Sequence, residues 1–144
     1  MEENVQPKKE AWDWAKHKPN NMFSITASSD MEFFKWWCTL IHPFVSFTPK
    51  EMDVISAFLK QYFELLKQVP IELVNTMLMS KDTRDKVIAD CGITLQHLYV
   101  IMGALRKKKV FSDSGINPKI IPNIRKNDNG TFQLLILIDK KNDL

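Results

Sequence analysis

The chain has 144 residues, 44% of them hydrophobic and 26% charged, which suits one domain with an appended arm and excludes two separate cores. Two cysteines, Cys38 and Cys91, are too few for a disulfide framework, and no apolar stretch follows the acidic start, so we expect a cytoplasmic protein without a secretory signal. The net charge of +3 is uneven, because residues 81–126 hold ten basic and four acidic side chains, and this excess indicates either a polyanionic partner or a solvated lysine-rich face.

Residues 1–47 are expected to form an aromatic-rich N-terminal arm and a docking helix. The helix is predicted to begin at the cap-capable Ser29 or Asp30 and to end before Pro43. Its apolar side chains almost encircle the axis, so it is packed on two sides or is an interaction element, and it is too short and too charged to span a bilayer. Exposed aromatic residues in such number invite aggregation, so Trp36 and Trp37 are expected to be buried in protein. The candidate partner-binding residues are Trp12, Trp14, Phe33, Phe34, Trp36 and Trp37.

Residues 48–139 are expected to form the domain itself. Thr48 and Glu51 have the spacing of a capping box, so a helix is predicted to begin there. Apolar residues at spacings of three and four continue that helix to about Gln68. Residues 71–79 then predict a second, short apolar helix.

Two further helices joined by a tight turn carry the functional prediction. The first is capped by Ser80 or Asp82 and ends near Cys91, and the second is predicted to run from Thr94 to about Lys108. Gly92 lies between them, where the turn needs a residue that tolerates a positive φ angle. Two helices connected in this way form a helix-turn-helix. The side chains expected to face inward from the second helix are Leu98, Ile101, Met102 and Leu105.

The stretch that begins at Arg84 resembles the helix-turn-helix motif as known families display it. The apolar positions that match are Val87, Cys91, Ile93, Leu98 and Ile101, and Gly92 falls at the turn. Ile88 departs from the motif, which usually has a small residue there so that the two helices can approach. The run from Leu105 to Phe111 resembles the end of the second helix in MarR-like winged-helix proteins, with Lys109 in place of a glycine. Residues 116–119 are weakly similar to plasmid replication initiators.

This resemblance covers about Thr48 to Asp139 and implies a mainly α fold with a small β-hairpin, the wing. The wing is placed in the apolar runs 119–124 and 131–139, which Asn129-Gly130 joins with the sequence of a hairpin turn. Within it, 132–138 is predicted to be a strand, and the unbroken apolar run 134–138 indicates burial on both faces. Residues 140–144 are expected to be a short polar tail.

The resemblance implies a binding module rather than an enzyme, and duplex DNA is the usual partner of winged helices. The candidate nucleic-acid-binding residues are Thr94, Gln96, His97 and Tyr99 on the outer face of the second helix, Arg106, Lys107, Lys108 and Lys109 at its end, and Arg125 and Lys126 at the wing tip.

An alternative function stays open, because that outer face presents Leu95 and Val100 and has no Arg or Lys between Thr94 and Leu105. Such a face also suits a protein groove. The fold would then serve as a structural or adaptor subunit of a larger assembly, for instance a phage virion or head-tail connector component. In that case the arm and the final strand would bind a protein partner or a second copy.

The motifs of common enzyme and metal sites are missing from the sequence. It contains no Gly-rich phosphate loop, no Gly-x-Ser-x-Gly elbow and no His-Glu-x-x-His pair. Cys38 and His42 have a spacing that can ligate zinc, but no nearby pair completes a site with four ligands. We therefore expect no catalytic residues, no metal and no cofactor.

Overall fold

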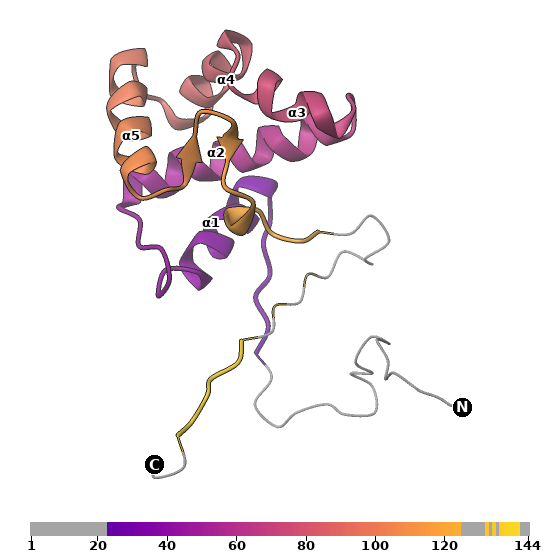
Figure 1. Cartoon of the computed structure of the whole chain (residues 1–144), viewed down its shortest axis with the longest axis vertical. Helices are drawn as coiled ribbons and strands as arrows, with labels where there is room; N and C mark the ends of the chain where they lie inside the picture. Colours follow the sequence, from indigo (N-terminus) through magenta and orange to yellow (C-terminus); the bar gives the residue numbers. More distant parts are fainter. Residues whose placement is uncertain (1–22, 125–131, 133, 135, 142–144) are drawn as a thin grey trace, which may run out of the picture.

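The computed structural model describes residues 23–124, 132, 134 and 136–141, which form a mainly helical fold with one small antiparallel sheet. In chain order the elements are α1 (Asp30–Leu40), α2 (Pro49–Leu66), α3 (Ile71–Leu78), α4 (Lys81–Cys91), α5 (Leu95–Lys107), β1 (Phe111–Ser112), β2 (Gly115–Ile116) and the 3-10 helix η1 (Pro118–Ile120). The helices gather into one body, and the last described stretch of the chain leads away from it (Figure 1).

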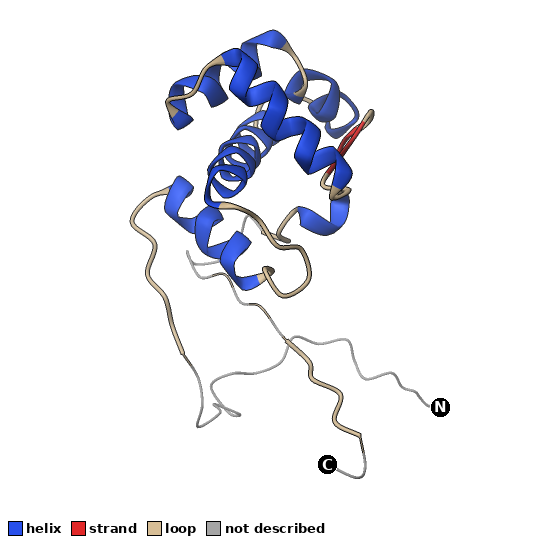
Figure 2. Ribbon diagram, turned by 90° about the vertical axis from the view of Figure 1, so that its left-hand side faces the viewer, coloured by secondary structure: helices blue, strands red, loops and turns tan. Residues whose placement is uncertain are grey.

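α2 is the central helix, in contact with the other four α-helices. The predicted capping box starts it, because the Thr48 hydroxyl accepts from the Glu51 amide while the Glu51 carboxylate accepts from the Thr48 amide. Its buried side chains include Ile55, Phe58 and Leu59, each fully removed from solvent. Figure 2 shows the other helices arranged around it.

The aromatic side chains of α1 are divided between the core and the surface. Phe34 and Trp37 are buried, and the Trp37 indole N–H donates to the Ile120 carbonyl at 2.7 Å. Trp36 is 38% exposed, so its predicted burial was wrong, while that of Trp37 is confirmed. Adjacent residues on a helix point about 100° apart, so only one of the two neighbouring indoles faces the core. Phe132 packs edge-on against Trp37, with ring centres 5.8 Å apart, and holds the later chain on α1.

The two helices of the predicted turn are present with the expected boundaries. Ser80 caps α4 and Thr94 caps α5, each accepting from the amide three residues on. Gly92 ends α4 in the left-handed region at φ 65°, as its place between the helices predicted. The helix axes bend by 100° at this break. The inward prediction for α5 is confirmed as well, since Leu98, Ile101, Met102 and Leu105 are buried.

The hairpin lies elsewhere than the sequence predicted. It follows α5 directly, with Phe111 opposite Ile116 and Ser112 opposite Gly115. β1 contacts α5 and β2 contacts α3, so two helices support strands of only two residues each (Figure 1).

The predicted final strand was wrong at the residues that the structure describes; 133 and 135, like the predicted turn Asn129-Gly130, lie outside them. Phe132, Leu134 and residues 136–138 have no regular secondary structure. Leu137 and Ile138 are 78% and 87% exposed, so the expected burial on both faces is wrong too. An apolar run predicts burial only where a surface is available to receive it, and the described helices pack against one another instead.

Over the described part of the chain, no single helix is long and apolar enough to cross a membrane; α4 and α5 meet that test only when taken together.

Candidate nucleic-acid interface

The outer face of α5, together with its cap Thr94, consists of the side chains that the sequence predicted to face outward. Thr94, Leu95, Gln96, His97, Tyr99 and Val100 are all exposed. Thr94 is held in the cap, since its hydroxyl accepts from the His97 amide at 3.1 Å. Tyr99 and Val100 are 51% and 70% exposed, so the face combines polar groups with a sizeable apolar surface.

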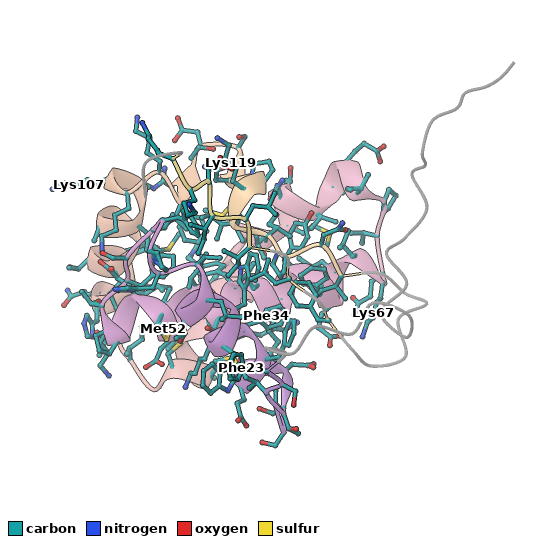
Figure 3. All side chains as sticks on the ribbon, turned by 90° about the horizontal axis from the view of Figure 1, so that it is seen from below. Phe23, Phe34, Met52, Lys67, Lys107 and Lys119 are labelled. Carbon is teal, nitrogen blue, oxygen red and sulfur yellow. The ribbon has the colours of Figure 1, made fainter. Side chains whose placement is uncertain are left out.

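The four basic residues at the end of α5 and just beyond it have different surroundings. The Lys108 ammonium donates to the Glu51 carboxylate and, at 2.8 Å, to the Ser46 carbonyl, so its charge is already neutralised. Arg106 pairs with Asp113 at 3.0 Å. Lys107 is exposed and points away from the body of the protein (Figure 3). Lys109 is also exposed, and of the described residues other than glycine it alone has a positive φ, 66°.

The Lys108 pair also changes the titration of Glu51. Burial acts to raise the pKa of this carboxyl, but hydrogen bonds from Lys108 and from the Thr48 amide outweigh it and lower the pKa below its ordinary value. The ionised form therefore stabilises the start of α2 and joins it to the end of α5.

The hairpin does not supply the basic tip that the wing prediction placed beside α5. Its turn carries Asp113 and Ser114, an acidic and a neutral residue. Arg125 and Lys126, the two predicted basic residues, lie outside the described residues, as do Trp12 and Trp14 of the arm. Among the described residues, the predicted basic residues beside this face are therefore Arg106, Lys107, Lys108 and Lys109, at the end of α5 and just beyond it.

A pocket of about 290 Å³ opens beside α5, where α3 ends, α4 begins and the hairpin turns back. It is lined by Met79, Arg84, Tyr99, Met102, Gly103, Arg106 and Asp113. The Nη1 of Arg84 donates a hydrogen bond of 2.7 Å to the Met79 carbonyl, while the Nε of Arg84 is buried without a hydrogen-bond partner. Sequence reasoning assigned Tyr99 and Arg106 to the interface but missed Arg84 and Asp113, which only the bend between α4 and α5 and the position of the hairpin bring together.

The four candidate partner-binding residues that the structure describes, all on α1, differ in how deeply they are buried. Phe34 and Trp37 belong to the core, where Phe34 stacks on Phe63 with ring centres 5.6 Å apart. Phe33 is half-buried against Phe34, and Trp36 is the most accessible of the four described aromatic residues of α1.

Neither cysteine has the surroundings of a metal ligand or a nucleophile. Burial raises the pKa of the Cys38 thiol to about 12 and that of the Cys91 thiol to about 11. Among the described residues no group of three His, Cys, Asp or Glu side chains comes together where it could hold a metal ion.

No family model, no curated protein and no solved structure matches this chain.

Proposed function

We propose that this chain is a non-enzymatic binding module that attaches to duplex DNA in the manner of a winged helix. In this proposal α4 and α5 are the helix-turn-helix, α5 enters the major groove, and the hairpin β1–β2 is the wing. The observation that carries the proposal is the 100° bend at Gly92, which leaves one whole face of α5 exposed at the edge of the molecule.

The chemistry of α5 supports the same function. Gln96 can form two hydrogen bonds to adenine, and His97 and Tyr99 can reach phosphates or bases. Lys107 and Lys109 stand exposed at the end of the helix and are suited to neutralise phosphates. Lys108 contributes less in this proposal than the sequence suggested, because Glu51 already neutralises its ammonium.

A salt series of duplex binding, followed by fluorescence anisotropy, tests the proposal. The logarithm of the affinity should fall linearly with the logarithm of salt, by about 0.9 for each phosphate contacted. Lys107→Ala should flatten that slope by about 0.9, whereas Lys67→Ala removes an equal charge at the opposite side of the molecule and should leave it unchanged (Figure 3). Gln96→Ala should alter the preference among sequences. Affinity weaker than about 10⁻⁴ M at physiological salt would refute DNA binding.

A second function, an adaptor in a protein assembly, is favoured by the apolar surface that the fold leaves exposed. Leu95, Tyr99 and Val100 form an apolar part of α5, and Leu137 and Ile138 are exposed near the end of the chain. Under this alternative, Val100→Asp should abolish an oligomer or partner complex seen by light scattering, and duplex binding should be absent.

A further inference from the structure

The pocket between α4, α5 and the hairpin brings together groups from three separate elements. Its lining includes the apolar side chains of Met79 and Met102, and Arg84 of α4 and Arg106 of α5 supply two guanidinium groups. A planar guanidinium presents N–H donors in a fork that matches the oxygens of a phosphate or carboxylate. Two arginines on one small pocket therefore favour an oxyanion ligand.

Arg84 is fixed by the fold at the wall of this pocket. Its Nη1 is fixed by the Met79 carbonyl at the end of α3, and its Nε is buried without an acceptor. Buried donors are nearly always paired, and an unpaired one on a charged group is costly. Because Nε is closed off from solvent, a ligand oxygen can supply the missing acceptor only if neighbouring side chains shift to admit it.

Asp113 shows which kind of group Arg106 binds, because it places a carboxylate on the guanidinium. The carboxylate of Asp113 lies 3.0 Å from the Arg106 Nη1, and its side chain is fully exposed on the hairpin turn. Such a pair is screened by water and weak, so another oxyanion can displace the carboxylate. Asp113 thereby occupies the place of the ligand on Arg106 and competes with it.

We propose that this pocket binds one phosphate group of a nucleic-acid backbone, held by Arg84 and Arg106 after Asp113 moves aside. The inference rests on the proposed function, because Tyr99 belongs both to the pocket and to the exposed face of α5. A phosphate is favoured over an acidic peptide because its tetrahedral oxygens can accept from two guanidinium groups that approach from different helices.

Two titrations of the full chain test the pocket. Inorganic phosphate, added against sodium chloride of equal ionic strength, should shift the backbone amide signals of Gly103 and Asp113 in the NMR spectrum. Arg106→Gln should abolish these shifts, weaken duplex binding about tenfold and lower the salt slope by about 0.9. Arg84→Lys keeps the charge but loses the fork, so it should also reduce the phosphate shifts.

The sharpest variant is Asp113→Asn, which removes the competing charge from an exposed position and leaves folding intact. Duplex affinity should rise about threefold. Glu64→Gln removes one negative charge from α2, away from the pocket, and controls for the change in net charge. Equal gains from both variants would overturn the competition between Asp113 and phosphate.

The remaining outcomes separate the pocket from the proposed function. If duplex DNA binds with a steep salt slope but phosphate leaves Gly103 and Asp113 unshifted, the pocket inference falls and DNA binding stands. If phosphate shifts both signals but no duplex binds, the assignment of the bound phosphate to a nucleic-acid backbone is overturned together with the proposed function. Poly-glutamate that shifts them as strongly as duplex DNA at equal charge would overturn the assignment to nucleic acid in favour of an acidic protein.

Discussion

Lys109→Gly should stabilise this protein, although it removes a side chain. Lys109 has φ 66°, in the left-handed region where a side chain costs roughly 1–2 kcal/mol. Glycine relieves that cost but gives the unfolded chain more conformational freedom, which offsets about 0.4–1 kcal/mol. The Lys109 carbonyl, which accepts from Asn117 at 3.0 Å, is retained. We expect a net gain of about 0.5–1 kcal/mol, a rise in Tm of roughly 2–6 °C for a domain of this size.

Two further variants make the test specific to the backbone. Lys109→Ala removes the same ammonium but keeps a Cβ, so it should leave Tm nearly unchanged. Gly92→Ala places a side chain at almost the same angle, φ 65°, where no other atom lies within 4 Å of the new Cβ, so only strain remains and stability should fall by about 1 kcal/mol. Thermal unfolding followed by circular dichroism measures all three. A Lys109→Gly protein no more stable than Lys109→Ala would refute the reasoning.

Three other changes test the core and the Lys108 pair. Leu98→Ala should cost about 2–5 kcal/mol in urea unfolding, because Leu98 is fully buried, and an unchanged midpoint would contradict that burial. Folding depresses the pKa of Glu51, so its contribution is complete above the ordinary value of 4.5 and is lost as the pH falls through the folded pKa. In the Glu51→Gln protein the free energy of unfolding should accordingly fall less steeply as the pH is lowered. An unchanged pH dependence would show that Lys108 does not stabilise the fold through this carboxylate. Deleting residues 1–46 removes buried Trp37 and Phe34, each worth about 3–5 kcal/mol, so the truncated protein should aggregate in gel filtration; one that melts like the full chain would disprove this packing.

The helices were predictable because their signals are local. Ser29, Thr48, Ser80 and Thr94 each cap a helix by accepting from an amide three residues on, and in the sequence each stands before a segment with helical spacing of its apolar residues. Gly92 was equally readable, since a break between two such runs with a glycine in it predicts a left-handed residue. The outward and inward sides of α5 followed from its period.

The hairpin was misplaced because its determinants are not local. Asn129-Gly130 is a strong turn signal between apolar runs, whereas strands of two residues at Phe111 and Gly115 leave almost no pattern to read. Their position depends on α3 and α5, against which they pack. Asn75 of α3 lies so near Gly115 that a Cβ there would overlap its amide, a contact across forty residues that only folding creates.

The candidate site likewise has features that one segment determines and features that only folding determines. The sequence alone determined that α5 would expose Gln96, His97 and Tyr99 and that four basic residues would lie at its end and just beyond, because helical period and composition are properties of one segment. Only the tertiary structure decided what those charges do, because folding sets which acidic side chains lie beside them. Glu51, 57 residues before Lys108, neutralises that ammonium, while Arg84 and Asp113 meet Arg106 beside a pocket. Electrostatic energy depends on distance in space, and folding sets that distance.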